Sequence, residues 1–246
     1  MTGASVARHP SLFTFNLLLS TFLFQLVTRP VPPSRGTLDI TNSSIPRGAI
    51  LAGGGATRFG GRPKGLEVVG GIRILDRLVE AFERALGAPP LLVANAPDAG
   101  SWRPDIRVVS DVRPGLGALG GILTAVLEAP APVVAVAWDM PFVSEALIRA
   151  LSEGLEKVDA FLPESGSRRG MEPLCAAYGP ACAAAIEASL ARDDLRAIGF
   201  HAGLKVGILS HEQLRALGDP ETLFFNVNTA EDLAEADRLW RHASSR

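Results

Sequence analysis

Cysteine and histidine are both scarce in this chain of 246 residues. It has two cysteines, Cys175 and Cys182, which are seven residues apart and form no CxxC pair, and it has four histidines. Disulfide frameworks and structural zinc sites need more of these side chains at closer spacing. The sequence therefore argues against both and fits a protein of the reducing cytoplasm, in which buried, inert thiols are expected.

The chain also has no excess of charge of either sign. Its formal net charge is -2, with 24 Lys and Arg residues against 26 Asp and Glu residues. A nucleic-acid-binding surface needs basic residues in excess on some face, so a nucleic acid is not an expected partner. Apolar residues make up 47% of the chain and charged residues 20%. This is the composition of a globular protein that buries a sizeable core.

The apolar run at residues 12–27 is 16 residues long, which is short for a membrane span of roughly 20 residues. Arg8 and His9 precede it, as in a signal peptide, and a linker rich in Pro, Ser and Gly follows. We interpret residues 1–46 as an extension from a start codon assigned too early. A targeting or anchoring segment and a surface helix are the alternatives. Residues 47–246 are expected to form the functional domain, without a membrane as partner.

From Gly48 onward, strand-like apolar runs alternate with segments of helical periodicity. Strands are expected at 49–53, 90–95, 106–111, 133–139, 158–163, 173–178, 205–209 and 222–227. Helices are expected at 74–86, 117–129, from Ser144 onward, and at 179–190, 193–200, 211–217 and 229–241. This alternation predicts an α/β fold of three layers, Rossmann-like, in which helices cover both faces of a mostly parallel sheet.

Ligands of such sheets bind beyond the carboxyl ends of the strands. The glycine and polar residues at the carboxyl ends of the expected strands are Gly53–Gly55, Asn95, Asp111 and Asp139. Topology alone therefore makes these residues the candidate site.

The stretch AILAGGGATRFGGRPKGLEVVGG, residues 49–71, contains eight glycines together with Arg58 and Lys64. It is not a Rossmann fingerprint, because Arg58 stands where the third glycine belongs, and it is not a P-loop, because Gly61 replaces the lysine. Glycines still let backbone N–H groups approach an anion, and the two cations add positive charge. We interpret the stretch as a phosphate-binding loop, with a glycine-rich turn that binds nothing as the alternative.

Four segments of the chain resemble one known family. The pattern L-A-G-G-x-x-x-R-x-G-G-x-x-K-G at 51–65 resembles the signature loop of the nucleotidyltransferases related to molybdenum cofactor guanylyltransferase. VVSDVRPGLGALGGI (108–122) resembles the family's second nucleotide segment, AWDMPFV (137–143) its metal-binding segment, and NVNTAEDL (226–233) its closing motif. The segments keep the family's order over residues 48–246. The resemblance implies a nucleotidyltransferase fold and nucleotidyl transfer.

The resemblance also implies the catalytic groups. Arg58 and Lys64 would hold the triphosphate and stabilise the charge that develops on it during transfer. Asp139 would hold Mg²⁺, the implied cofactor, through one carboxylate, while phosphates and waters complete the coordination shell. The alternative for Asp139 is a carboxylate that caps a helix or a turn.

Nucleotide-binding residues follow from the same resemblance. Backbone groups of Leu51, Ala52 and Gly53, together with Gly54, would contact the nucleotide. Asp111 would help to hold the base or the ribose. Asn95 ends its strand where the family has a nucleotide-facing residue, with capping of the next turn as the alternative. Trp102 and Trp138 are expected to be packing residues.

The acceptor side rests on Asn226 and Asn228, which match the family's closing motif, and on Arg168. Arg168 lies in SGSRRGMEPLCAAY (165–178), which resembles the family's loop and strand before its acceptor pocket. The alternative for the two asparagines is that they shape the turn before the last helix, with Thr229 as its N-cap and Asp232 at the third position. Arg168, next to Arg169 in a Gly- and Ser-rich loop, is otherwise a solvated surface residue.

The expected reaction is transfer of GMP from GTP to the terminal phosphate of molybdenum cofactor, with release of pyrophosphate. Gly53-Gly54 favours guanine, because related cytidylyltransferases carry L-A-A-G at this point of the loop. A CTP-dependent cofactor cytidylyltransferase and a sugar-phosphate nucleotidyltransferase are the nearest alternatives. A GTP-binding adaptor without turnover is the alternative of another class. Transient contact with cofactor-synthesis or acceptor proteins is expected.

Overall fold

The computed structural model of this chain describes residues 46–53, 63–129, 131–166 and 170–244. The apolar run at 12–27 lies outside this part, so the interpretation of residues 1–46 stays a prediction. Among the described residues, no helix is long and apolar enough to cross a membrane.

Within the described ranges, seven strands form one sheet in the order β5-β4-β1-β6-β8-β7-β9. All of its pairings are parallel except those of β8, which runs antiparallel to both β6 and β7. The sheet is therefore mostly parallel, as the alternation of apolar runs predicts. The strands are β1 (Arg47–Ala52), β4 (Leu91–Ala94), β5 (Val108–Val109), β6 (Val133–Ala137), β7 (Ala160–Pro163), β8 (Cys175–Tyr178) and β9 (Val206–Leu209).

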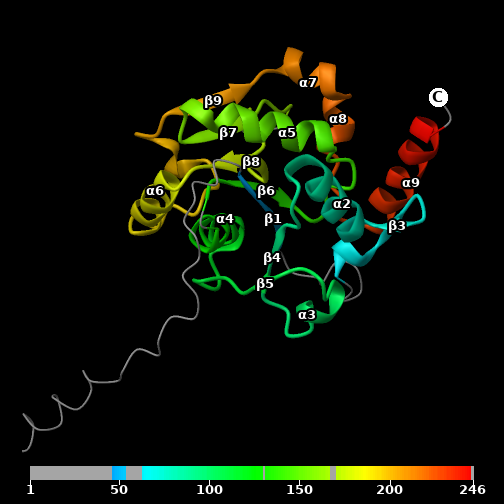
Figure 1. The fold of residues 1–246 in the computed structure, drawn as a ribbon, viewed down its shortest axis with the longest axis horizontal. Coiled ribbons are helices and arrows are strands. Elements are labelled where there is room, and N and C mark those ends of the chain that lie inside the picture. The colour runs from blue at the N-terminus through cyan, green and yellow to red at the C-terminus, as the bar shows by residue number, and fades with distance from the viewer. Residues whose placement is uncertain (1–45, 54–62, 130, 167–169, 245–246) are drawn as a thin grey trace, which may run out of the picture. The chain divides into compact units, whose positions relative to one another are not determined.

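Helices cover both faces of this sheet (Figure 1). The α-helices of the described residues are α2 (Ile74–Leu86), α3 (Ala99–Trp102), α4 (Gly117–Glu128), α5 (Glu145–Gly154), α6 (Ala181–Leu190), α7 (His211–Leu217), α8 (Pro220–Leu223) and α9 (Ala230–Ser244). Short 3-10 helices are η2 (Lys64–Leu66), η3 (Leu155–Lys157) and η4 (Gly199–His201). The three-layer α/β fold class is confirmed.

The hydrophobic core has two parts, one on each face of the sheet. Central strand β1 contributes to both, because alternate side chains of a strand point to opposite faces. Ile50 packs with α2 and α5 on one face, whereas Ala49 and Leu51 pack with α4 and α6 on the other. This central strand, buried from Gly48 to Leu51, carries its carboxyl end, Leu51 and Ala52, to a fixed place at one edge of the sheet.

Two predicted elements are wrong. The expected strand at 222–227 is replaced by the helical turn α8, because Pro220 takes its first position and the Asp219 side chain accepts from the backbone N–H of Thr222 at 3.0 Å. The expected helix at 193–200 is a turn followed by η4, because Asp193 adopts a left-handed conformation with φ of 56°. A non-glycine residue in that region interrupts a helix.

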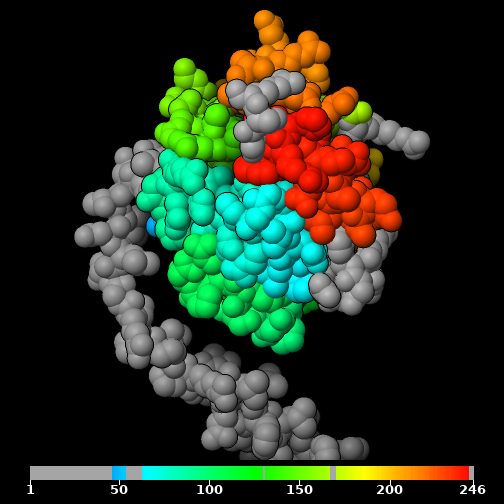
Figure 2. Space-filling model, turned by 90° about the vertical axis from the view of Figure 1, so that its right-hand side faces the viewer, coloured from blue at the N-terminus to red at the C-terminus, as the bar shows by residue number. Residues whose placement is uncertain are grey.

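A small hairpin of β2 (Val68–Val69) and β3 (Ile72–Arg73) follows η2 and packs on the C-terminal helix. Figure 2 shows α9, in red, against this hairpin, in cyan. The Asp237 carboxylate of α9 accepts from the backbone N–H of Gly70 at 2.8 Å, and the Arg77 guanidinium lies 3.7 Å from the centre of the Trp240 ring. The end of the chain is thereby attached to the segment that directly follows Lys64.

Candidate active site

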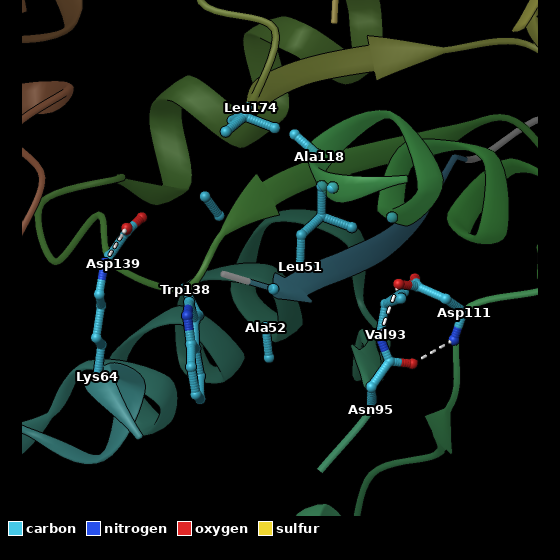
Figure 3. A pocket seen from close by; sticks show the side chains of 14 residues that line it. Leu51, Ala52, Lys64, Val93, Asn95, Asp111, Ala118, Trp138, Asp139 and Leu174 are labelled. Carbon is cyan, nitrogen blue, oxygen red and sulfur yellow. Dashed lines mark hydrogen bonds and ion pairs between the residues drawn. The ribbon is translucent and has the colours of Figure 1, made fainter. Parts of the chain in front are cut away.

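A cavity of about 250 Å³ lies at the carboxyl ends of β1, β4 and β6. It is therefore where parallel α/β sheets bind their ligands. Figure 3 shows Lys64, Trp138 and Asp139 on one side of it and Asn95 and Asp111 on the other. Its lining consists of Leu51, Ala52, Gly53, Lys64, Val93, Asn95, Asp111, Gly117, Ala118, Gly121, Ala137, Trp138, Asp139 and Leu174.

Lys64 and Asp139 form the charged side of the cavity. The ammonium of Lys64 lies 3.6 Å from the Asp139 carboxylate and donates a hydrogen bond to the side-chain oxygen of Asn228 at 2.6 Å. Lys64 is 8% exposed, which is unusual for a lysine unless it is paired. Residues from two distant parts of the chain thus fix this cation at the edge of the sheet.

The Asp139 carboxylate sits where burial opposes its charge. Burial raises the pKa of Asp139, and the nearby Lys64 ammonium offsets only part of this effect. Its Oδ1 atom is buried and has no hydrogen-bond partner among the described residues. Helix α5 is capped by Ser144, whose side chain accepts from the backbone N–H of Leu147. Asp139 is therefore not the helix cap that the sequence left as an alternative.

The free Oδ1 atom of Asp139 makes this side of the cavity suitable for a divalent cation. No group of three or more His, Cys, Asp or Glu side chains comes together within the described part of the chain. A cation here would take one carboxylate from the protein and its remaining oxygens from phosphates and water. Mg²⁺ commonly binds in this way, whereas zinc requires three or four protein ligands. The residues present fit the magnesium ion that the sequence predicts.

Asn95 and Asp111 form the opposite side. The Asn95 amide donates to the Asp111 carboxylate at 2.7 Å, and the backbone N–H of Asp111 donates to the Asn95 oxygen at 2.8 Å. The Asn95 side chain is thus used to join the ends of β4 and β5, not to cap the following turn. The alternative interpretation of Asn95 is wrong, and both side chains border the cavity as predicted.

Behind this pair, Thr124 of α4 is fully buried. Its hydroxyl donates to the backbone oxygen of Gly120 at 2.8 Å and accepts from the backbone N–H of Val112 at 3.0 Å. These bonds attach the segment after β5 to α4, whose first turns supply Gly117, Ala118 and Gly121 to the cavity wall.

The two predicted acceptor-side asparagines lie in different surroundings. Asn228 does not line the first cavity itself, but its side-chain oxygen accepts from the ammonium of Lys64, which does. Asn226 donates to the backbone oxygen of Phe224 at 2.8 Å and borders a second cavity of about 590 Å³. That cavity is lined by Ser165, Gly166, Glu172, His211, Arg215, Asp219, Pro220, Glu221, Phe224, Phe225 and Asn226.

The N-terminus of α9 is capped by the residues that the sequence offers for this role, Thr229 and Asp232. The Asp232 carboxylate accepts from the backbone N–H of Thr229 at 2.9 Å, and the Thr229 hydroxyl accepts from the backbone N–H of Asp232 at 3.1 Å. This reciprocal pair is a capping box. It fixes the turn that presents Asn228 to Lys64.

Three predicted site residues, Gly54, Arg58 and Arg168, lie outside the described residues. Conversely, the sequence patterns gave no functional weight to Trp138 or Leu174, which both line the first cavity. Trp138 directly precedes Asp139, and this position was its one available signal. Leu174 is an apolar residue with no polar group to mark it in its segment, and antiparallel strand β8 brings it to the site from a distant part of the chain.

Cys175 and Cys182 are buried free thiols. Burial raises the pKa of Cys182 to about 12 and that of Cys175 well above its usual range, so both remain protonated near neutral pH. Neither lines the first cavity. The prediction that both thiols are buried is confirmed, and their raised pKa agrees with the expectation that they are inert.

Sequence and structure comparisons agree on one family. The profile of the MobA-like NTP transferase domain matches residues 48–205. A probable molybdenum cofactor guanylyltransferase of Pelotomaculum thermopropionicum is 36% identical over 190 residues, which cover 77% of this chain and 90% of that protein. A molybdenum cofactor guanylyltransferase of Desulfosudis oleivorans is 32% identical over 193 residues, covering 77% and 93%.

Among solved structures, molybdopterin-guanine dinucleotide biosynthesis protein A from Archaeoglobus fulgidus is similar to this chain with a TM-score of 0.68 and 25% sequence identity. The match covers 80% of this chain and 99% of that protein. Because fold, cavity position and sequence all agree, the chain belongs to the MobA-like NTP transferase domain family and is a nucleotidyltransferase.

Proposed function

We propose that this protein transfers GMP from GTP to the terminal phosphate of molybdenum cofactor and releases pyrophosphate. The observation that carries the proposal is the Lys64–Asp139 pair, 3.6 Å apart at the edge of the cavity. The relatives named as molybdenum cofactor guanylyltransferases supply the acceptor and the base. Two buried free thiols support a reducing compartment, and we place the reaction in the cytoplasm.

The chemistry follows from where charge develops. An oxygen of the acceptor phosphate attacks the α-phosphorus of GTP and forms a new P–O bond. The bond between the α-phosphorus and the oxygen that bridges to the β-phosphate breaks, and pyrophosphate leaves with that electron pair. Mg²⁺ held by Asp139 would neutralise charge on the phosphates. Lys64 donates to the same phosphates, and Asn228 and Asp139 hold its ammonium in place before the reaction begins.

The opposite side of the cavity would recognise the nucleoside. The ends of β1 and β4 supply backbone groups of Leu51, Ala52 and Gly53. Asp111 can accept from the N–H groups on the edge of guanine, because a carboxylate accepts hydrogen bonds and does not donate them. Asn95 keeps this carboxylate in place. Cytosine offers fewer donors, so this pairing supports GTP over CTP.

The acceptor would enter from the second cavity. Residues 224–228 run from this cavity, which Asn226 borders, to the ammonium of Lys64, which Asn228 contacts. An acceptor held here would therefore approach the triphosphate along Asn226 and Asn228. Arg168 would meet its phosphate. The product would then pass to cofactor-synthesis or acceptor proteins by transient contact.

Pyrophosphate release tests the proposal directly. The full-length chain is incubated with Mg²⁺ and molybdenum cofactor, and GTP, CTP, ATP and UTP are offered in turn. Release with GTP alone is the expected result. Lys64→Ala and Asp139→Asn should each lower kcat by about 10²- to 10³-fold. Lys157→Ala, which changes an exposed lysine of η3 outside both cavities, is the matched control and should keep wild-type activity.

Two other results would overturn the proposal in different ways. Release mainly with CTP would keep the fold and the mechanism but change the base. GTP binding without release, in an assay where a known guanylyltransferase is active, would make the protein an adaptor or point to a different acceptor.

A further inference from the structure

Trp138 occupies an unusual place for a packing residue. It directly follows β6, precedes the proposed metal ligand Asp139, is 3% exposed and lines the nucleotide cavity. Its ring stacks on Trp102, with ring centres 5.2 Å apart and planes inclined by 23°. Trp102 is held in turn by a hydrogen bond from its indole N–H to the Asp98 carboxylate at 2.9 Å. The two rings form one aromatic wall beside the charged side of the cavity.

The turn that carries Lys64 rests on this wall. Gly65 follows Lys64 in η2, and a Cβ atom on Gly65 would lie 2.4 Å from Cε3 and 2.9 Å from Cδ2 of Trp138. Real Cβ atoms do not approach other heavy atoms this closely, so Gly65 is needed for the contact. The backbone next to Lys64 therefore lies directly against the six-membered ring of the Trp138 indole.

Packing, and not hydrogen bonding, holds the Trp138 ring at this place. Its indole nitrogen is buried and has no partner among the described residues. A buried N–H group without a partner destabilises the folded protein. A phenylalanine would fill much of the same space without that cost. The part of Trp138 that acts on the Lys64 turn is thus the aromatic ring that Gly65 meets, and not the indole N–H.

We propose that Trp138 is a positioning residue that holds the Lys64 turn against the sheet, so that the ammonium stands at the edge of the cavity before substrate binds. Asn228 and Asp139 fix the tip of the Lys64 side chain, and the Trp138–Gly65 contact fixes its base. The catalytic part of this inference rests on the proposed function, in which Lys64 contacts the triphosphate. The positional part concerns the chain alone.

Amine labelling tests the positional part without any activity assay. The chain has three lysines, Lys64, Lys157 and Lys205, and the last two are exposed. An acylating reagent is applied to the full-length protein, and labelling at each lysine is followed by mass spectrometry. Lys64 should react slowly in the wild type and several-fold faster in Trp138→Ala. Lys157 and Lys205 serve as internal standards whose rates should not change.

Kinetics test the catalytic part. Trp138→Ala should lower kcat for pyrophosphate release by about 10- to 100-fold, because a displacement of about 1 Å at a catalytic group has effects of this size. KM for GTP should change far less, since the loss falls on the transition state. Trp138→Phe should restore most of kcat. Trp240→Phe, a change on α9 outside the cavity, is the control and should leave both constants unchanged.

A double-mutant cycle tests the contact itself. Introduced into the wild-type protein, Gly65→Ala should lower kcat. Introduced into the Trp138→Ala variant, it should have little further effect, because the ring that would clash with the new Cβ atom is then absent. Gly100→Ala is the matched control, since a Cβ atom there meets nothing within 4 Å. If the two substitutions lower kcat independently, so that their effects add in the double variant, the Trp138–Gly65 contact does not act on Lys64.

Failure of the inference and failure of the proposed function give different results. A wild type that releases no pyrophosphate from any nucleotide contradicts the proposed function, while labelling still decides the position of Lys64. An active, folded Trp138→Ala with wild-type kcat and unchanged Lys64 labelling overturns the positioning role. If Trp138→Ala does not fold, Trp138→Leu takes its place. The positioning role would also be overturned if Trp138→Phe lowered kcat as much as Trp138→Ala does, because the indole N–H would then be the essential group.

Discussion

At the scale of single residues, Asp139 shows a conflict between stability and function. Because burial raises its pKa, the folded protein binds this proton more tightly than the unfolded chain does. Stability therefore falls as pH rises from the ordinary aspartate pKa of 3.8 through the raised value, and remains lower above it. Ionisation of Asp139, which the proposed metal site requires, therefore lowers the stability of the protein without metal.

Asp139→Asn should accordingly remove activity without lowering stability. Calorimetry in the presence of a chelator at pH 7 should give a melting temperature equal to or above that of the wild type. Asp105→Asn is the matched control, because the Arg103 guanidinium holds the pKa of Asp105 below its usual range. Removal of this carboxylate should therefore not raise the melting temperature. A melting temperature several degrees below that of the wild type would contradict the prediction for Asp139→Asn.

His201 should make the protein sensitive to acid. Both of its ring nitrogens are buried without a partner among the described residues, and burial lowers the pKa of His201 below 6.5. The unfolded chain therefore takes up this proton first, so stability is constant above about pH 6.5 and falls as pH drops from there toward the lowered value.

His201→Leu should reduce this loss. Thermal melts between pH 8 and pH 5 should show a smaller decrease in melting temperature for the variant than for the wild type. Ala202→Ser, at an exposed residue next to His201, is the control and should keep the wild-type pH dependence. Equal pH profiles for wild type and His201→Leu would show that His201 is not responsible.

At the scale of elements, the β2–β3 hairpin depends on its glycines. Gly70 has φ of 60°, and a Cβ atom there would lie 2.1 Å from the Trp240 ring of α9. Gly70→Ala should therefore lower the free energy of unfolding by about 1–3 kcal/mol. Gly71→Ala is the matched control. The φ of Gly71 is 84°, but a Cβ atom there meets nothing within 4 Å. Its replacement should therefore lower the free energy of unfolding by only about 1 kcal/mol. Denaturant titration of both variants decides whether the contact with α9 matters.

Most elements could be predicted from sequence because their signals are local. Helix α2 has an apolar face and ends at Gly87, whose φ of 72° is typical of a helix end, and α5 begins at its predicted cap, Ser144. One of the two errors arose at Asp193, whose left-handed backbone interrupts the expected helix, and the other arose where short-range capping overruled the apolar pattern. Pro220 and Asp219 convert an apparent strand into a helical turn. The β2–β3 hairpin was missed because its strands are only two residues long.

At the scale of the whole molecule, the predicted domain boundary can be tested. The buried hydrophobic residues of the described chain run from Ala49 to Ala236. A chain of residues 47–246 should therefore unfold in one cooperative transition, with the melting temperature and denaturant dependence of the full-length protein. A lower melting temperature for the shorter chain would show that residues 1–46 stabilise the fold.

The site was predictable only in part, for a topological reason. Strand order brings Leu51, Asn95, Asp111 and Asp139 to one edge, and residues at strand ends carry that information in the sequence. The hydrogen-bond partner of Lys64 could not be predicted in this way. Asn228 lies 164 residues further along the chain, and no local pattern reports their hydrogen bond. Contacts of this kind depend on how complete elements pack.

The Lys64–Asn228 hydrogen bond also has a consequence for the synthesis of the protein. The backbone N–H of Val227 donates to the backbone oxygen of Asp139 at 2.8 Å, and Asn228 accepts from Lys64, so the last fifth of the chain completes the charged side of the cavity. During synthesis the N-terminal part of the chain leaves the ribosome first. A nascent chain would therefore carry its glycine-rich loop and Asp139 well before Asn228 emerges. Its ability to consume nucleotide should appear only at the end of translation.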